Sequence, residues 1–347
     1  MIYLPVTPDS LQQAADIIKD GGLVAFPTET VYGLGADAFN STALAKIFDA
    51  KNRPYFDPLI IHIAAIESLE KVADISLIDE KTRKKLFLLA ENLWPGPLSI
   101  VLPKNKKIPG IATAGLETAA IRFPDHDAAQ KLISLSSGAV AAPSANPFGS
   151  LSPTKAEHVR DKLGNKVDMI LDGGSTRIGL ESTVLDISSD SIKILRPGGT
   201  SKEVIEELVG SIDNGELRIK NEKHVKSAVH SPKASPGMLK SHYAPKTPLY
   251  TLNREEIFCQ PAKTGDVFLF FDDSTRDLWQ KKQNLPEAGT IRVLSDTGNM
   301  LEAASRLFEI LHELDNGDYL RIYAQLVPKE GLGEAINDRL IRASRRE

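Results

Sequence analysis

Two cations close to a run of hydroxyl side chains are the residues in this sequence best suited to chemistry. Lys51 and Arg53 follow a segment with helical spacing of apolar residues, and Pro54 disfavours helix at the residue before it. Both cations are therefore expected in a short loop. The segment 26–38, FPTETVYGLGADA, brings hydroxyls, one glutamate and two glycines close to them. Such a loop suits a polyphosphate, although cations at a helix end often only complement its dipole.

More polar side chains follow apolar strands further along the chain. Arg122 ends the apolar run 118–121, where its guanidinium could bind a carboxylate with two hydrogen bonds or simply lie exposed at a strand end. Ser144 and Asn146 follow the small-residue strand 139–142, which leaves room for a ligand. Because open α/β sheets bind ligands at such strand ends, we expect both residues at the mouth of a site.

The elements that must position these residues alternate between strands and helices, which predicts an α/β fold. Thr7 and Pro8 are expected to begin the first helix, and Thr154 with Glu157 predicts a capping box at a later one. Gly33 and Gly35 are expected in a turn, with close backbone approach or positive φ. Strands are predicted in the first part of the chain at 23–26, 59–63, 98–102, 118–124, 139–142, 169–172, 181–186 and 192–195.

Length and composition favour a globular protein of two domains. The chain has 347 residues, of which 41% are hydrophobic and 25% charged, and its net charge of −4 gives no global signal for nucleic-acid binding. Its one cysteine, Cys259, excludes an internal disulfide and is typical of a reducing compartment. The sequence contains no signal-peptide pattern and no membrane-length apolar run, so a cytoplasmic location without membrane contact is expected.

The string from Thr28 to Arg53, with Thr-Glu-Thr-Val-Tyr-Gly-Leu followed by Lys-x-Arg, closely resembles the signature of the YrdC-domain family, the threonylcarbamoyl-AMP synthases. Ser144-x-Asn146 is similar to the second signature of that family. The resemblance covers the first part of the chain nearly end to end, and the remainder resembles the longer, two-domain form. It implies a YrdC-like catalytic domain at 1–210, built on a twisted mixed sheet with flanking helices.

The same resemblance implies a linker at 211–246 and a smaller Rossmann-like α/β domain at 247–347. Alternation in the sequence supports the last of these, with predicted strands at 249–252, 266–271, 291–294 and 319–327 and helices at 301–314 and 334–343. The linker stretch 231–245 combines Ser-Pro-Gly-Met with lysines, a histidine and a tyrosine. It is either a tether pinned to the surface or a lid that closes over ATP.

The resemblance assigns the candidate residues to two ligands. Lys51 and Arg53 are expected to be catalytic, since they would neutralise phosphate charge. His62 alone would more often be structural, but the family places a substrate-contacting histidine there. The residues expected to bind ATP are Lys51, Arg53, Thr118, Ser144, Asn146, Ser152, Arg196, Ser235 and Tyr243. The residues expected to bind L-threonine are Thr30, Tyr32, His62, Arg122, Ala142 and Ser182.

The implied activity is that of a nucleotidyltransferase. It would make L-threonylcarbamoyladenylate from L-threonine, bicarbonate or carbon dioxide, and ATP, with release of pyrophosphate. The product would pass to the downstream machinery that forms threonylcarbamoyladenosine in tRNA. Mg²⁺ is expected with ATP, held chiefly by phosphates and water, and we expect no metal ligands from the protein. Catalysis by positioning and charge stabilisation requires no covalent nucleophile.

Two alternatives remain open from the sequence. One is an RNA-binding or tRNA-handling protein without adenylation activity, although near-neutral charge disfavours strong RNA binding. The basic run 81–85 is most simply a solvated helix face, and a weak tRNA contact there is the less favoured interpretation. The other is an adenylyl or carbamoyl transferase that acts on a different amine. Pyrophosphate release with and without L-threonine distinguishes them.

Overall fold

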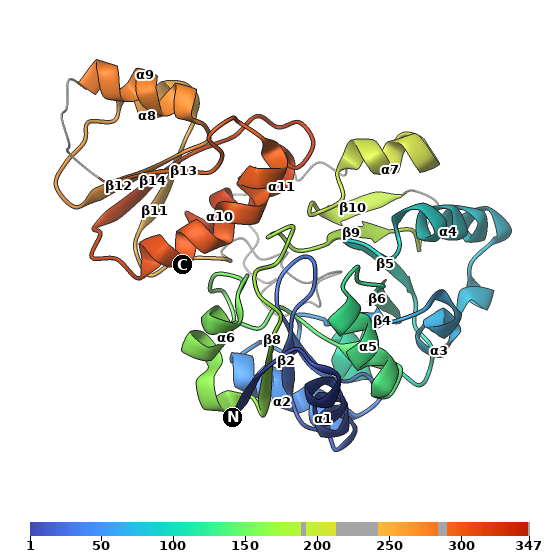
Figure 1. Ribbon diagram of the computed structural model, residues 1–347. Helices are drawn as coiled ribbons and strands as arrows, with labels where there is room; N and C mark the ends of the chain where they lie inside the picture. The colour runs from blue at the N-terminus through green and yellow to red at the C-terminus, as the bar shows by residue number, and fades with distance from the viewer. Residues whose placement is uncertain (189–191, 213–241, 284–289, 346–347) are drawn as a thin grey trace, which may run out of the picture.

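The chain forms two β-sheets with helices packed against them (Figure 1). The computed structural model describes residues 1–188, 192–212, 242–283 and 290–345. Within these ranges the first sheet has ten strands in mixed orientation and the second has four parallel strands. The predicted α/β class, with a large mixed sheet and a smaller parallel one, is confirmed.

The large sheet mixes parallel and antiparallel neighbours. In spatial order its strands are β1 (Ile2–Pro5), β8 (Met169–Asp172), β2 (Val24–Phe26), β3 (Gly33–Asp37), β7 (Ala139–Ala141), β4 (Ile60–Ile63), β6 (Thr118–Arg122), β5 (Leu98–Pro103), β9 (Thr183–Asp186) and β10 (Lys193–Arg196). The helices of this part are α1 (Pro8–Lys19), α2 (Ser41–Lys51), α3 (Leu69–Val72), α4 (Glu80–Leu93), α5 (Asp127–Leu135), α6 (Ala156–Leu163) and α7 (Lys202–Val209).

The central strands separate an apolar core from a second, partly polar face. On β4, Ile61 and Ile63 point into the main core together with apolar residues of α2 and α4. Because side chains alternate along a strand, His62 lies on the opposite face. It pairs in register with Val140 on β7 and Arg122 on β6, so these three side chains share that face. Helices α1 and α5 cover the part of the face near β2, β7 and β8.

The small sheet contains β11 (Leu249–Leu252), β14 (Arg321–Gln325), β12 (Asp266–Phe270) and β13 (Thr290–Val293), in that spatial order. Its helices are α8 (Arg254–Cys259), α9 (Asp273–Gln283), α10 (Met300–Asp315) and α11 (Gly333–Ala343). Figure 1 shows α10 and α11 on the side that faces the large sheet, with α8 and α9 on the far side. None of the helices in the described ranges is both long enough and apolar enough to span a membrane.

The two parts of the chain are packed against each other through α10 and α11. Leu151 and Leu180 from the first part share one apolar core with Leu307, Phe308 and other residues of the second. Polar contacts surround that core: Lys155 pairs with Glu309 at 2.5 Å, Lys162 pairs with Asp315 at 3.3 Å, and the rings of His158 and His312 stack with centroids 3.9 Å apart. The small domain is therefore docked on the large one.

Two local predictions differ from the structure. Gly33 and Gly35 lie inside strand β3 and not in a turn, and neither has positive φ. The alternative, close approach of their backbone to a ligand, stays a prediction. A Cβ on Gly35 would come within 2.7 Å of the Phe26 ring, so packing against β2 requires this glycine. The capping box is absent: α6 has Lys155 at its N-cap with no side-chain cap, and the Thr154 amide is 3.3 Å from His158 Nδ1.

The linker prediction at 211–246 falls largely outside the described residues, because 213–241 are not described. The lid proposed at 231–245, which includes Ser235, also falls largely outside the described residues. Of that stretch, the structure describes only 242–245.

Candidate active site

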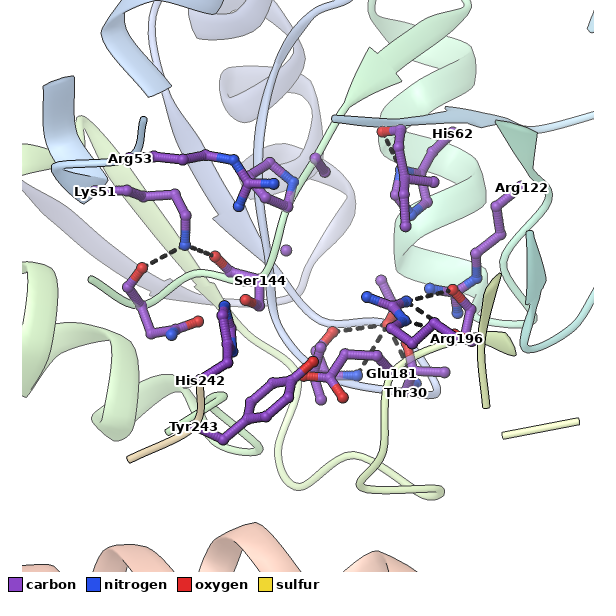
Figure 2. Close-up of a pocket in the computed structure, with 18 of the residues that line it drawn as sticks. Thr30, Lys51, Arg53, His62, Arg122, Ser144, Glu181, Arg196, His242 and Tyr243 are labelled. Carbon is purple, nitrogen blue, oxygen red and sulfur yellow. Dashed lines mark hydrogen bonds between the residues drawn. The ribbon is translucent and has the colours of Figure 1, made fainter. Parts of the chain in front are cut away.

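A pocket lies on the second face of the large sheet, over β4 and β6 (Figure 2). It is built by segments that are far apart in the sequence: the loop after β2, the end of α2, strands β4 and β6, the loop after β7, the start of β9, the end of β10 and residues 242–243. The described residues that line it are Thr28, Thr30, Val31, Gly33, Lys51, Arg53, Ile60, His62, Arg122, Ala142, Pro143, Ser144, Asn146, Phe148, Glu181, Ser182, Arg196, His242 and Tyr243.

Lys51 is the last residue of α2 and is buried at the pocket wall. Asn52 takes the left-handed conformation at the helix C-cap, which ends the helix before Arg53. The Lys51 ammonium donates to the carbonyl of Ser144 at 2.5 Å and to that of Asn146. Burial, helped by nearby Arg53, holds the pKa of Lys51 well below its usual range. The loop after β7 thus fixes one cation at the pocket.

Arg53 is fixed by its own loop. Its Nε donates to the Asp57 carbonyl at 3.0 Å, and its Nη2 donates to the Pro58 carbonyl at 2.8 Å. Nη2 also lies 2.9 Å from the Asp57 carboxylate, and both side chains are buried. Burying a charged pair is costly unless further hydrogen bonds complete it, as they do here. The result is a second cation in a defined orientation beside Lys51.

Arg122 and His62 lie on the opposite side of the pocket from Lys51 and Arg53 (Figure 2). Arg122 Nη2 is 2.6 Å from the Glu29 carboxylate, and its Nε donates to the Gly96 carbonyl at 3.3 Å. His62 Nδ1 lies 3.2 Å from the Ile60 carbonyl oxygen. Burial, followed by the Arg122 charge, lowers the pKa of His62 to about 3. His62 is therefore a neutral imidazole at neutral pH.

Arg196, at the end of β10, is held by the residue that precedes β9. Its Nη2 donates to the Ser182 carbonyl at 2.8 Å and to the Ser182 hydroxyl at 3.2 Å. That hydroxyl is also 2.8 Å from the Ser99 hydroxyl on β5. Strands β5, β9 and β10 thus jointly fix a buried guanidinium that lines the pocket.

Glu181 is the one acidic residue among the described residues that line the pocket. Its Oε1 accepts from the Ser152 hydroxyl at 2.5 Å, and its Oε2 lies 2.8 Å from Nε of Arg339 on α11. Burial alone would raise the pKa of Glu181, but the Arg339 and Arg196 charges and the Ser152 hydroxyl outweigh it and hold the pKa at about 2. Glu181 is therefore ionised.

His242 and Tyr243 bring the segment before the small domain to the pocket. Tyr243 has a φ of 62° and is 1% exposed. Its ring lies 4.1 Å from that of His242 and 5.6 Å from that of Phe308, measured between centroids. The next amide, of Ala244, donates to the Gly149 carbonyl at 2.8 Å. These contacts place both rings against the pocket, as Figure 2 shows.

The structure brings most of the predicted site residues into this one pocket. Those that line it are Thr30, Lys51, Arg53, His62, Arg122, Ala142, Ser144, Asn146, Ser182, Arg196 and Tyr243. Their individual roles stay predictions. Glu181 was not predicted, although a carboxylate directly before Ser182 at the start of a strand is a usable signal.

Three described residues of the predicted set do not line the pocket. Thr118 is at the opposite end of β6 from Arg122, so the length of the strand separates them. Tyr32 is fully buried, and its hydroxyl donates to the Gly174 carbonyl at 2.7 Å. Ser152 is buried behind Glu181, which its hydroxyl contacts. A direct ligand contact by the Thr118, Tyr32 or Ser152 side chain is not supported in this arrangement.

A twisted mixed sheet that carries a cationic pocket, with a second α/β domain docked beside it, provides a concave site suited to an anionic ligand. Comparison with known proteins specifies the class of protein. The family model described as Telomere recombination, which groups Sua5, YciO and YrdC, matches residues 16–198. The model described as Threonylcarbamoyl-AMP synthase, C-terminal domain, matches residues 200–345.

Individual relatives agree with these matches. The chain is 41% identical to threonylcarbamoyl-AMP synthase of Pyrococcus abyssi, over 95% of this chain and 93% of the relative, and 39% identical to that of Bacillus subtilis, over 98% and 94%. A crystal structure of P. abyssi Sua5 complexed with L-threonine superposes with a TM-score of 0.80 at 37% identity, covering 99% of this chain and 96% of that one. The chain belongs to the threonylcarbamoyl-AMP synthase family and is a nucleotidyltransferase.

Proposed function

We propose that this protein makes L-threonylcarbamoyladenylate from L-threonine, bicarbonate or carbon dioxide, and ATP, releasing pyrophosphate. The observation that carries the proposal is the charge of the pocket. Lys51, Arg53, Arg122 and Arg196 face one space, and the only acid among its described lining residues is already paired. Such a site favours a ligand with several negative charges. The names of the relatives support threonylcarbamoyl-AMP as the product, and the L-threonine bound by the P. abyssi protein supports L-threonine as a substrate.

The two sides of the pocket suit two different substrates, ATP and L-threonine. Lys51 and Arg53 would neutralise the phosphates of ATP, with Arg196 adding a third cation and Ser144 and Asn146 polar contacts. These groups are already fixed by backbone carbonyls, so binding ATP requires little reorganisation. In that case they would stabilise the extra charge that develops as pyrophosphate leaves.

The other side suits an amino acid. Arg122 is oriented by Glu29 and Gly96, and we assign its guanidinium to the threonine carboxylate. Thr30 and Ser182 supply hydroxyls and neutral His62 supplies a hydrogen-bonding nitrogen that does not compete as a cation. The small side chain of Ala142 leaves space beside them.

The chemistry proceeds in two steps without a covalent enzyme intermediate. The deprotonated threonine amine attacks the one-carbon substrate, which gives a carbamate together with water from bicarbonate, or with a released proton from carbon dioxide. A carbamate oxygen then attacks the α-phosphorus of ATP, the bond to the β-phosphate oxygen breaks, and pyrophosphate leaves. The side chains position the reactants and offset their charge. The product would supply the threonylcarbamoyl group for tRNA modification.

Mg²⁺ would enter with ATP. The carboxylates nearest the pocket are each paired with a guanidinium: Glu29 with Arg122, Asp57 with Arg53, and Glu181 with Arg339. No group of three or more metal-ligating side chains occurs within the described ranges. This donor set fits Mg²⁺ held mainly by phosphates and water, which is its usual mode. The ion would supply charge neutralisation on the triphosphate.

Pyrophosphate release tests the proposal. With ATP, Mg²⁺ and bicarbonate, we expect pyrophosphate to appear only when L-threonine is added. Release that does not depend on L-threonine would contradict the assignment. Release with a different amino acid instead would indicate a transferase for another amine, and tRNA binding without any release would indicate the tRNA-handling alternative.

A further inference from the structure

One side chain of the small domain reaches the pocket wall of the large domain. Arg339, on α11, is 0% exposed, and its guanidinium makes contacts in four directions. Nε lies 2.8 Å from the Glu181 carboxylate, Nη2 donates to the Pro197 carbonyl at 3.0 Å, and Nη1 lies 2.6 Å from Asp338. Its central carbon also lies 5.1 Å from the centre of the Tyr243 ring. A buried arginine with this many partners is held in one orientation.

The contact matters because Glu181 is a carboxylate in a pocket proposed to bind phosphates, where its negative charge weakens their binding. It would repel the triphosphate, and it could capture a cation that the triphosphate needs. Arg196 is the nearest candidate, since its charge already acts on Glu181. In the observed arrangement Arg339 takes one carboxylate oxygen and Ser152 takes the other. Arg196 is bonded to Ser182 instead.

We propose that Arg339 is a positioning residue for ATP binding: it neutralises Glu181 and holds it against the pocket wall, which keeps an uncompensated negative charge away from the triphosphate. The inference rests on the proposed function. It assigns a role to the small domain, which supplies the counter-charge for an acid in the active site of the large one. The same guanidinium also contacts Tyr243, a second residue that lines the pocket.

The test uses the full-length chain with Arg339→Met, Glu181→Gln and the double variant. Arg339→Met keeps much of the side-chain volume but leaves Glu181 without its counter-charge, so we expect the KM for ATP to rise about tenfold or more, with a smaller change in kcat. In the double variant the unpaired charge is gone, and we expect the KM for ATP to return to within about threefold of the wild-type value. A merely structural role for Arg339 predicts no such rescue.

The pH dependence gives a second readout. Removing Arg339 removes the charge that lowers the pKa of Glu181 most, so that pKa rises relative to the wild type. Lowering the pH then protonates Glu181 more readily in the variant and removes the repulsion. We expect the ratio of the Arg339→Met KM for ATP to the wild-type KM to fall as the pH is lowered. The charged and titratable groups near Glu181 are Arg339 and Asp338 on α11, Arg196 at the end of β10, Lys51 on α2, and His242 and Tyr243. When Glu181→Gln is introduced into both the wild type and Arg339→Met, the ratio of their KM values for ATP should no longer depend on pH.

Lys162→Met is the matched control. It also removes a buried contact between the two domains, the pair with Asp315, but Lys162 does not line the pocket. We expect its KM for ATP to equal that of the wild type even where its Tm is lower. An unchanged KM for ATP in folded Arg339→Met, or a double variant no better than that single variant, would overturn the inference. Wild-type protein that lacks threonine-dependent pyrophosphate release would instead count against the proposed function itself.

Discussion

The two sheets bury very different side chains. The large sheet places four buried cations, Lys51, Arg53, Arg122 and Arg196, around one pocket. The small sheet buries aromatic rings against one another on one face, with Phe268 4.5 Å from Trp279 and 5.2 Å from Tyr323 between ring centroids. Burying like charges close together costs free energy that apolar packing does not. The large sheet therefore carries a cost that an anionic ligand would offset, while the described strands of the small sheet bury mainly apolar and aromatic side chains.

The contact between the sheets refines this comparison. Many of the polar groups by which the small domain touches the large one are on α10 and α11. Most of them, such as Glu309 and His312, meet α6 or the loop before it, away from the lining of the pocket. The Gly331 amide, which precedes α11, also donates to the Glu203 carboxylate on α7 at 3.3 Å. Of the ion pairs Lys155–Glu309, Lys162–Asp315 and Glu181–Arg339, only the last reaches a residue that lines the pocket. The Phe308 ring and the Arg342 carbonyl also contact residues 242–243, which line it too. The small domain thus contributes one charge to the wall of the site, together with ring and backbone contacts.

The largest effect is expected at the cations of the large sheet. Lys51→Ala should lower kcat/KM by about 100-fold or more, because it removes a fixed charge from the phosphate side of the pocket. Steady-state pyrophosphate release measures it. Lys46→Ala is the matched control: Lys46 is on the same helix and also donates to a backbone carbonyl, that of Gly21, but away from the pocket. Equal losses in both variants would contradict the assignment.

The next effect separates the two sides of the pocket. Arg122→Lys keeps the charge but loses the two-pronged geometry, so we expect the KM for L-threonine to rise about tenfold while the KM for ATP changes little. Arg177→Lys, at an exposed arginine that pairs with Asp125, is the control and should change neither. Equal rises in both KM values for Arg122→Lys would show that this arginine supports the pocket as a whole.

A smaller effect is expected when the pH is lowered, because two histidines lie at the contact between the domains. Burial lowers the pKa of His158 to about 4 and that of His312 to about 3, so the folded state holds both rings neutral. Their contribution to stability is complete above about pH 6.5, the usual pKa of histidine, and is lost as the pH falls toward about 4 and then 3. Tm measured against pH should therefore fall below about pH 6.5.

Replacing both rings tests that assignment. His158→Gln with His312→Gln should give a shallower fall in Tm, while His62 and His242 at the pocket still contribute to the remainder. An unchanged slope in this double variant would show that the acid sensitivity has another origin.

The smallest effect is expected from the core of the small sheet. Ile322→Val on β14 removes one buried methylene group and should lower the free energy of unfolding by about 1 kcal/mol, with no change in either KM. Ile61→Val on β4 is the equivalent change in the large sheet. It should cost a similar free energy, measured by denaturant unfolding. A change in KM from Ile322→Val would mean that the small sheet influences the pocket through more than Arg339.

Periodicity predicted much of the fold but not its weaker elements. Strands such as 98–102 and helices such as that beginning after Thr7 have clear apolar patterns and lie where expected. Strand β1 was not predicted, because its four residues carry no period and depend on pairing with β8. Helices α8 and α9 were also missed, since few of their residues are buried.

The site was predictable where function is concentrated in short motifs. Lys51 and Arg53 are two positions apart at the end of one helix, and Ser144 and Asn146 are two positions apart in one loop, so local spacing indicated them. Thr118 was expected to bind ATP, although Arg122 at the other end of the same strand is the residue that lines the pocket.

The contact between Glu181 and Arg339 could not be found in this way. The two residues are 158 positions apart, and Arg339 is one of several charged residues in an amphipathic helix. Local spacing carries no information about a pair that forms only when the two domains dock. The signal is tertiary, and only the structure supplies it.

Direct detection of the product tests the central claim most directly. The protein is incubated with ATP, Mg²⁺, L-threonine and carbon-labelled bicarbonate, and the reaction is examined by mass spectrometry. The account predicts threonylcarbamoyl-AMP that carries the label, formed together with an equal amount of pyrophosphate and lost in Lys51→Ala. Pyrophosphate formed without labelled threonylcarbamoyl-AMP, or labelled product at an undiminished rate in Lys51→Ala, would contradict it.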